Sequence, residues 1–288
     1  MHIMKAAVIV NISKQKAIEC AEKITALMSK KGVETLMLSE CSSFFDRADI
    51  TYFDDHKALF AACDFAVTVG GDGTIIHAAK YAAVCDKPLI GVNVGRLGFA
   101  ADLESDELDR LTDIIEGKYT TEKRMTLDVE VFSNGVSKHY IAVNDAVVAH
   151  GQMSKIIDLQ LSLDGEVISK YRADGLLFST PTGSTAYSLS AGGPIVAPEM
   201  DCILMTPVCP HSLFSRSVLF EGSSELGVTV TIPRECSCVL TIDGEKNINI
   251  TETDKIFIRK SEWVLNLMTI HKRNFYRKLN EKLKEREL

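Results

Sequence analysis

The chain has 288 residues, of which 46% are hydrophobic and 25% charged, a composition that excludes a disordered or collagen-like protein. Its formal net charge of −7 lacks the basic excess on which non-specific nucleic-acid binding depends, so we expect no nucleic-acid partner. Apolar runs stay well below the ~20 residues needed to cross a bilayer, and the start Met1-His2-Ile3 lacks the features of a secretory signal. We therefore expect a cytoplasmic protein without a membrane partner, and the length predicts two domains.

The first third of the chain alternates short apolar runs with helical spacing of apolar residues. Strands are predicted at residues 5–10, 33–38, 65–69 and 88–92, and helices at 17–28, with Gly32 as a C-cap, and at 75–82. Strands that alternate with helices form a mostly parallel sheet through right-handed crossovers. Residues 1–122 are therefore predicted to form a three-layer, Rossmann-like α/β domain, with ligands at the carboxyl ends of its strands.

Residues 123–271 have a different pattern, with short alternating strands separated by turn signals such as Asn134-Gly135, Asp164-Gly165 and Asp243-Gly244. This pattern predicts an all-β domain. Residues 273–288 alternate charges of both signs around apolar positions and predict a closing helix. We expect residues 272–288 to return to the first domain. Eight scattered cysteines without a C-x-x-C pair indicate reduced thiols rather than a zinc site.

The sharpest local motif is Gly70-Gly71-Asp72-Gly73-Thr74, at a predicted strand-to-helix turn. Glycines leave backbone N–H groups accessible to a phosphate. The negative charge of Asp72 would repel that phosphate unless the carboxylate takes a proton from a hydroxyl or shares a divalent cation with it, and both roles belong to phosphoryl transfer. An ordinary Asx turn that caps the next helix is the competing interpretation.

A second motif is the hydroxyl-rich segment Thr180–Pro194, which follows the apolar run Gly175–Phe178. It offers many donors and acceptors for a sugar or a base edge, although a long polar loop has the same composition. Asn144-Asp145 ends another apolar run, and Arg172 and Asp174 precede a third. Amide, carboxylate and guanidinium groups are thus predicted at the ends of several strands.

Together these motifs resemble the NAD kinases in sequence and in order between residues 65 and 245. The segments that match are Gly70–Thr74, Gly91–Phe99, Asn144-Asp145, Thr180–Pro194 and Cys209–Leu213. The first motif is shared with phosphofructokinases and with diacylglycerol- and sphingosine-type lipid kinases, so it identifies the superfamily, whereas Thr180–Pro194 is specific to NAD kinases. The resemblance implies the fold of that superfamily, an α/β domain followed by a β-rich domain.

The resemblance also implies roles for individual residues. Asp72 would accept the proton of the attacking ribose hydroxyl, and it is the protein group that we name as a neighbour of Mg²⁺ or another divalent cation. The turn for the donor phosphates would comprise Gly70, Gly71, Gly73 and Thr74. NAD would be bound by Asp72, Gly73, His77, Asn144, Asp145, Lys155, Arg172, Asp174, Thr185, Ala186, Tyr187, Ser188, Leu189, Ser190 and Glu245.

The activity implied is phosphorylation of the 2′-hydroxyl of NAD with ATP, or with polyphosphate, to give NADP. Family members are commonly homodimers or homotetramers, which is the assembly we expect. At Asp145 the family usually has glutamate, and at Glu245 it often has glutamine. Two other functions use the same residues: a lipid kinase with the same glycine turn, which would need an apolar or basic membrane-facing surface, and a non-catalytic dinucleotide sensor.

Overall fold

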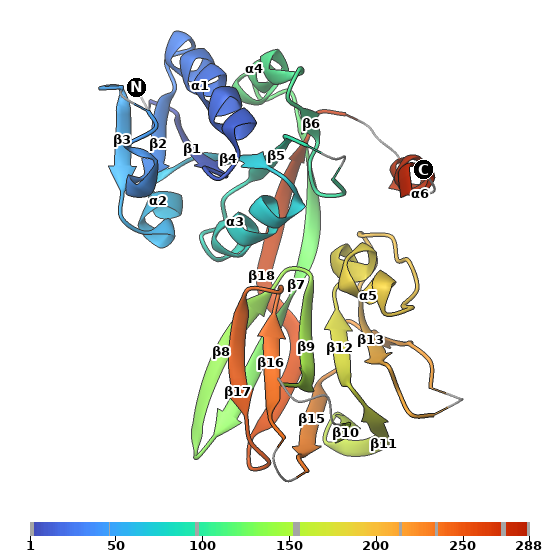
Figure 1. Cartoon of the computed structure of the whole chain (residues 1–288). Helices are drawn as coiled ribbons and strands as arrows, with labels where there is room; N and C mark the ends of the chain where they lie inside the picture. Colours follow the sequence, from blue (N-terminus) through green and yellow to red (C-terminus); the bar gives the residue numbers. More distant parts are fainter. Residues whose placement is uncertain are drawn as a thin grey trace. The chain divides into compact units, whose positions relative to one another are not determined.

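The computed structural model describes residues 3–45, 47–95, 98–151, 156–212, 215–233, 236–271 and 275–286, and Figure 1 labels their helices and strands. By internal contacts the chain divides into two compact units. Unit 1 comprises Met1–Lys123 and Val264–Leu288, and unit 2 comprises Arg124–Trp263. No helix among the described residues is long and apolar enough to cross a membrane.

Unit 1 contains a parallel sheet with strand order β5-β4-β1-β2-β3, to which β6 is added beside β5. The strands are β1 (Lys5–Val10), β2 (Glu34–Leu38), β3 (Ile50–Phe53), β4 (Phe65–Gly70), β5 (Leu89–Asn93) and β6 (Leu103–Glu104). The central strand β4 is buried along its whole length, as its uninterrupted apolar sequence favours in a sheet covered on both faces. The chain changes direction of winding between β1 and β4, so the carboxyl ends of these two strands form the usual ligand position of an open α/β sheet.

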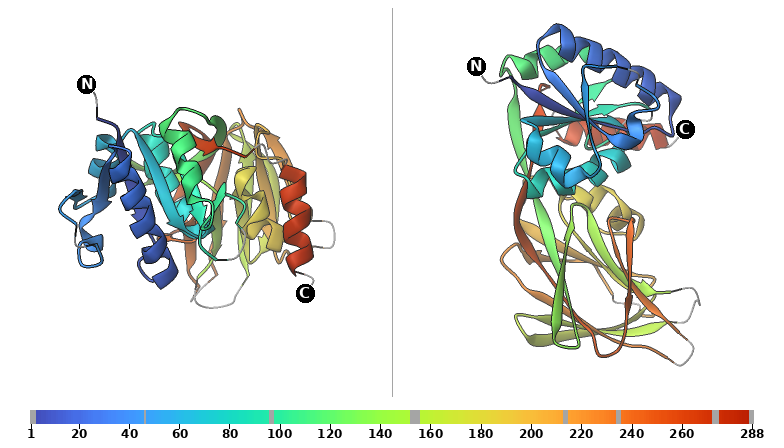
Figure 2. Two further views of the ribbon diagram at one scale, coloured as in Figure 1. Left: turned by 90° about the horizontal axis from the view of Figure 1, so that it is seen from above. Right: turned by 90° about the vertical axis from the view of Figure 1, so that its left-hand side faces the viewer.

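Helices cover both faces of this sheet, with α1 and α4 on one face and α2 and α3 on the other (Figure 2). Their bounds are α1 (Gln15–Lys30), α2 (His56–Ala62), α3 (Asp72–Val84) and α4 (Leu111–Ile115), with short 3-10 turns η1 (Ser39–Cys41) and η2 (Leu108–Arg110). The helix α1 buries Ala17, Ala21, Ile24 and Met28, whose spacing places them on one stripe. It ends before Gly32, whose φ of +73° confirms the predicted C-cap glycine. The predicted three-layer α/β domain is confirmed.

The elements of unit 1 that were not predicted are the edge strand β3, the helices α2 and α4, the 3-10 turns η1 and η2, and the two-residue strand β6. The closing helix is present as α6 (Phe275–Arg286) and is grouped with unit 1.

Unit 2 is built from antiparallel strands in two sheets, which confirms the predicted all-β domain. One sheet has six strands in the order β14-β13-β12-β9-β16-β17, and the other contains β11-β10-β15-β18, with β7 beside β18 and β8 beside β7. The bounds are β7 (Thr120–Ser133), β8 (Val136–Ala142), β9 (Asp145–His150), β10 (Ile157–Leu163), β11 (Glu166–Ala173), β12 (Gly175–Ser179), β13 (Cys202–Val208), β14 (Val218–Glu221), β15 (Leu226–Thr231), β16 (Cys238–Ile242), β17 (Lys246–Ile250) and β18 (Lys255–Thr269).

The core of unit 2 is formed by residues of both sheets, including Leu159 and Val228 from one and Phe178, Met205 and Leu240 from the other. The predicted turns at Asn134-Gly135, Asp164-Gly165 and Asp243-Gly244 connect hairpins, and all six of their residues have φ between +49° and +86°. Two consecutive residues with positive φ match the twist of the flanking strands, which explains the Asn-Gly and Asp-Gly pairs.

Candidate active site

The glycine turn of unit 1 lies at the carboxyl end of β4 and leads directly into α3, as predicted. Gly70 allows a close approach, since a Cβ there would lie 2.4 Å from Thr74 Oγ1. Gly73 is exposed and has open space around it. The turn therefore leaves room for a ligand at Gly73, next to the first N–H groups of α3, which have no acceptor within the helix.

Asn11, at the carboxyl end of β1, joins this turn. Its backbone N–H donates to the carbonyl of Val69 at 3.0 Å, and its side-chain amide donates to Thr74 Oγ1 at 3.4 Å. The sequence analysis did not name Asn11, because a single asparagine after a strand has many ordinary uses. The structure places it at the switch point between β1 and β4, beside the motif that was named.

Asp72 is the first residue of α3, and its half-buried carboxylate is held by the loop after β5. The backbone N–H of Phe99 donates to Oδ2 at 2.9 Å, and that of Ala100 donates to Oδ1 at 3.1 Å. Gly98 permits this contact, because a Cβ on it would lie 2.2 Å from Asp72 Oδ1. The two N–H donors fix the direction of the carboxylate, which can therefore act as an oriented proton acceptor.

The same loop is bound by the C-terminal helix. The Nζ of Lys278, on α6, donates to the carbonyl of Phe99 at 3.0 Å and to that of Ala101 at 2.5 Å. Asp102 accepts the N–H groups of Ile270 and His271 at 2.8 and 3.2 Å. The end of the chain thus holds the segment whose amide groups orient Asp72.

His77 belongs to an aromatic cluster between α2 and α3. Its ring lies 5.0 Å from the ring of His56 and 5.9 Å from that of Tyr81, while His56 stacks on Tyr81 at 4.5 Å. Burial lowers the pKa of His56, and a charge on His77 would lower it further.

In unit 2, Asn144 and Asp145 form a sharp turn between β8 and β9. Asp145 is 5% exposed, and burial together with the charge of Asp243 raises its pKa to about 7. Asp243, in the turn between β16 and β17, accepts the backbone N–H groups of Val143, Asn144 and Asp145. Asp243 was noticed in the sequence as a turn residue only. Glu245 is exposed and belongs to the same β16–β17 turn.

The hydroxyl-rich segment after β12 is compact rather than an open loop. It forms the 3-10 helix η3 (Thr182–Thr185) and the single-turn helix α5 (Tyr187–Ser190). Some of its hydroxyl groups form hydrogen bonds within unit 2. Ser184 Oγ donates to the Val196 carbonyl at 3.1 Å, and Ser188 Oγ lies 3.2 Å from Thr206 Oγ1.

The predicted dinucleotide-binding residues of this segment therefore differ in exposure. Ser188 is fully buried and Thr185 is 8% exposed, whereas Tyr187 is 47% exposed and Ser190 is exposed as well; Ala186 and Leu189 are half-buried. Within this segment the most exposed side chains are thus those of Tyr187 and Ser190, and the buried hydroxyls hold the segment together.

Arg172 and Asp174 lie near the first residue of β12, at the end of that strand opposite to the hydroxyl-rich segment. Asp145 pairs with Ser179 at the last residue of β12, while Asp174 precedes its first residue and lies 3.8 Å from His150 Nε2. Five strand residues span about 16 Å. The structure therefore brings Asn144, Asp145, Glu245 and the segment Thr182–Ser190 toward one end of the six-stranded sheet and places Asp174 at the opposite end.

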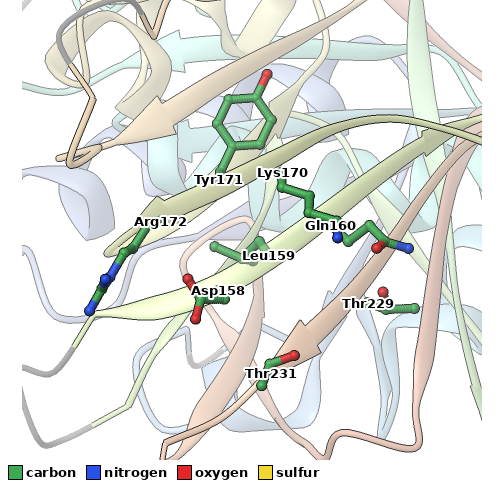
Figure 3. A pocket seen from close by; sticks show the side chains of 8 residues that line it. All are labelled: Asp158, Leu159, Gln160, Lys170, Tyr171, Arg172, Thr229 and Thr231. Carbon is green, nitrogen blue, oxygen red and sulfur yellow. The ribbon is translucent and has the colours of Figure 1, made fainter.

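Arg172 belongs to the other sheet of unit 2. It is exposed on β11 opposite Asp158 of β10, and both line a cavity of about 390 Å³ together with Lys170 and Tyr171 (Figure 3). The side chains of Lys170, Arg172 and Asp158 thus line this cavity with two basic groups and one acidic group. Lys155, also predicted to bind the dinucleotide, lies outside the described residues.

No group of three or more His, Cys, Asp or Glu side chains that could hold a metal ion is present in the described part of the chain. A single carboxylate does suit Mg²⁺, which commonly binds one or two carboxylates together with substrate phosphates and water. Asp72, half-buried at the end of β4, fits that donor set.

Comparison with known proteins gives one consistent result. The family model for the ATP-NAD kinase N-terminal domain matches residues 6–119, and the model for the ATP-NAD kinase C-terminal domain matches residues 143–270. The NAD kinase of Prosthecochloris aestuarii is 35% identical over 286 residues, which cover 97% of this chain and 96% of the relative. The NAD kinase of Caldanaerobacter subterraneus is 36% identical over 287 residues, which cover 98% and 99%.

Solved structures agree with these relatives. Yeast NADH kinase, in a crystal structure with NADH, superposes with a TM-score of 0.87 at 26% identity, covering 98% of this chain and 88% of the yeast chain. The NAD kinase of Archaeoglobus fulgidus, in a structure with ATP, gives 0.74 at 25% identity and covers 98% and 99%.

Proposed function

This chain belongs to the NAD kinase family, and on that premise we propose that it transfers the γ-phosphoryl group of ATP to the 2′-hydroxyl of the adenosine ribose of NAD, giving NADP. The observation that supports the chemistry most directly is the position of Asp72. It stands at the carboxyl end of β4, beside the switch point of the sheet, with both carboxylate oxygens oriented by loop amides.

In this mechanism the 2′-oxygen attacks the γ-phosphorus in line with the leaving group. The new O–P bond forms as the bond between the γ-phosphorus and the bridging oxygen breaks, and ADP leaves with that electron pair. The hydroxyl proton passes to the Asp72 carboxylate. Alignment and charge neutralisation provide most of the rate enhancement in phosphoryl transfer, and positioned proton transfer adds a smaller part.

Mg²⁺ or another divalent cation is proposed to arrive with ATP, and when bound it neutralises charge on the phosphates. Asp72 is the residue that would hold it. The backbone N–H groups of Gly71 and Gly73, at the start of α3, are proposed to bind donor phosphate. Polyphosphate would satisfy the same donors, because backbone amides do not distinguish the rest of the phosphate donor.

Unit 2 is proposed to bind the dinucleotide. Asn144, Asp145, Tyr187 and Ser190 offer an amide, a carboxyl, an aromatic ring and a hydroxyl at one end of the six-stranded sheet. Thr185, Ala186, Ser188 and Leu189 are proposed to shape the same segment, with Gly73, His77, Lys155 and Glu245 as further binding positions.

The position of Arg172 and Asp174, at the other end of β12, supports a homodimer or homotetramer. In that assembly these two residues of one copy bind the dinucleotide of another. Mixing subunits tests the idea: D72N chains and D174A chains, each nearly inactive alone, would regain activity when refolded together. Activity no greater than the sum of the separate preparations would contradict it.

A cytoplasmic location is also proposed, which the buried thiols of Cys20, Cys41, Cys63, Cys202 and Cys238 support because thiols stay reduced there.

The test of the reaction is an endpoint assay of the purified full chain with ATP, MgCl₂ and NAD, in which an NADP-specific dehydrogenase reports the product. We expect NADP to form in this assay. When EDTA is present from the start, we expect no NADP to form. Parallel assays replace ATP by polyphosphate, NAD by NADH, and NAD by diacylglycerol. Phosphorylation of the lipid without any NADP would overturn the proposal, and binding of NAD without turnover under all donors would point to a sensor instead.

A further inference from the structure

The turn Val143–Asp145 is held by a single carboxylate from a distant part of the chain. Asp243 Oδ2 accepts the N–H of Val143 at 2.9 Å, and Oδ1 accepts those of Asn144 and Asp145 at 2.7 and 3.0 Å. The N–H of Asp243 donates in return to the carbonyl of Asp145 at 2.9 Å. Three successive amides on one carboxylate are a charge-assisted arrangement that fixes the backbone direction of the turn.

The carbonyl side of the same turn is fixed from β12. The N–H of Thr180 donates to the Asn144 carbonyl at 2.9 Å, and its hydroxyl donates to the Val143 carbonyl at 2.7 Å. Gly183 packs so closely that a Cβ on it would lie 2.2 Å from the Asn144 carbonyl oxygen. Both edges of the turn are therefore bonded, and the side chains of Asn144 and Asp145 inherit a fixed direction.

Asp243 also brings a second carboxylate next to Asp145. In the strand register Asp145 stands opposite Ser179 of β12, and on its other side β9 pairs with β16, which continues into Asp243. Asp243 is the charged group among these neighbours, and its charge adds to burial in raising the pKa of Asp145 to about 7. The ionisation of Asp145 thus changes within the range of physiological pH.

We propose that Asp243 is the residue that positions the Asn144–Asp145 turn for the dinucleotide, and that its charge makes NAD binding through Asp145 weaken in acid. This inference rests on the proposed function, because it takes NAD as the ligand of that turn. An ionised Asp145 accepts hydrogen bonds from the hydroxyl groups of a ribose or the amino group of adenine, and protonation removes part of that capacity.

The informative variant is Asp243→Asn. Asparagine keeps the size of the side chain and one oxygen acceptor, so two of the three amide bonds can remain, but it removes the charge beside Asp145. Asp164→Asn is the matched control. Asp164 also precedes a glycine in a hairpin turn of unit 2, has the same kind of backbone with φ of +50°, and accepts one amide, that of Glu225, at 3.0 Å.

The first arm needs no activity. Carboxyl ¹³C NMR of the full chain follows the titration of Asp145, assigned by its loss in Asp145→Asn. We expect Asp145 to titrate near pH 7 in the parent and in Asp164→Asn, and at a lower pH in Asp243→Asn. An unchanged midpoint in Asp243→Asn would overturn the electrostatic part of the proposal.

The second arm measures the KM for NAD between pH 5.5 and 8.5. In the parent and in Asp164→Asn we expect KM to rise as pH falls below 7, approaching tenfold per pH unit. In Asp145→Asn the rise disappears, and in Asp243→Asn it begins at lower pH from a KM already raised several-fold at pH 8. A merely structural role would raise KM equally at every pH, and that result would overturn the proposal. Absence of NADP with every variant, while the NMR midpoints shift as expected, would instead count against the proposed function.

Discussion

Two aspartates, Asp72 in unit 1 and Asp145 in unit 2, occupy turns beside buried strands, yet their surroundings differ. The carboxylate of Asp72 is half-buried, and two backbone N–H groups donate to it. The carboxyl of Asp145 is almost fully buried and has another carboxylate as its charged neighbour. Two N–H donors surround the carboxylate of Asp72, which is the proton acceptor in the proposed mechanism. A like charge lies beside Asp145, whose carboxyl titrates near neutral pH.

The largest expected effect comes from Asp72→Asn, which removes the proposed proton acceptor and retains the shape of the side chain. We expect kcat to fall by about 10²–10⁴-fold, the usual contribution of positioned proton transfer. The dissociation constant for NAD, measured by calorimetry, is expected to change less than about threefold. A variant that loses NAD affinity and kcat in parallel would show that Asp72 binds the substrate rather than accepting its proton.

A second test moves Asp72 instead of replacing it. In Gly98→Ala the new Cβ would lie 2.2 Å from Asp72 Oδ1, so the carboxylate or the loop has to shift. We expect kcat to fall by about 10–100-fold, because a displacement of about 1 Å in a catalytic group has that order of effect.

Gly222→Ala is the matched control. Gly222 also packs against an aspartate, but in unit 2, and its new Cβ would lie 2.1 Å from Asp201 Oδ1. It is expected to lower thermal stability with kcat nearly unchanged. Equal kcat losses in the two variants would mean that crowding a carboxylate, rather than displacing Asp72, causes the effect.

The third test uses the stability of unit 2. The pKa of Asp145 is raised from 3.8 to about 7, so the folded protein retains a proton that the unfolded chain loses. The resulting stability is fully present below pH 3.8 and is lost as pH rises through 7. Asp145→Asn removes this loss, and its free energy of unfolding in urea is expected to exceed that of the parent by roughly 1–1.5 kcal/mol more at pH 8.5 than at pH 6. A difference that does not depend on pH would contradict the raised pKa.

The sequence predicted those parts of the fold whose cause is local. The buried run Phe65–Val69 followed by Gly70–Thr74 places a strand, a turn and a helix correctly, since strand burial and glycine geometry act within a few residues. The Asn-Gly and Asp-Gly turns were found for the same reason. The edge strand β3 was missed because its four residues include one buried position and show no clear alternation.

The parts that escaped prediction depend on contacts between distant residues. Asp243 lies 98 to 100 residues from the amides it accepts, and Phe99 lies 27 residues from Asp72. Nothing in the sequence next to these residues indicates such a contact. The segment after β12 has the composition of a loop, yet the contact of Ser184 with Val196 makes it compact. Sequence patterns therefore identified the polar groups of the candidate site but not the backbone amides and carboxylates that orient them.

The smallest expected effect tests whether the C-terminal helix contributes to the setting of Asp72. Lys278→Met removes the two hydrogen bonds from α6 to the carbonyls of Phe99 and Ala101, while the N–H groups of the loop remain. We expect kcat to fall by about 2–5-fold with KM for NAD unchanged, since one solvent-accessible bond of this kind is worth roughly 0.5–1 kcal/mol. Arg277→Met serves as control, because Arg277 is 82% exposed and pairs with Glu281 on the same helix.

The double variant Lys278→Met with Asp72→Asn then tests whether Lys278 affects kcat through Asp72 or through another part of the protein. If Lys278 acts by orienting Asp72, its loss adds nothing once Asp72 is replaced, and the two effects are not additive. A further 2–5-fold loss of kcat in the double variant would mean that α6 supports the reaction by another route. In that case the orientation of Asp72 would depend on the amides of Phe99 and Ala100 without help from the end of the chain.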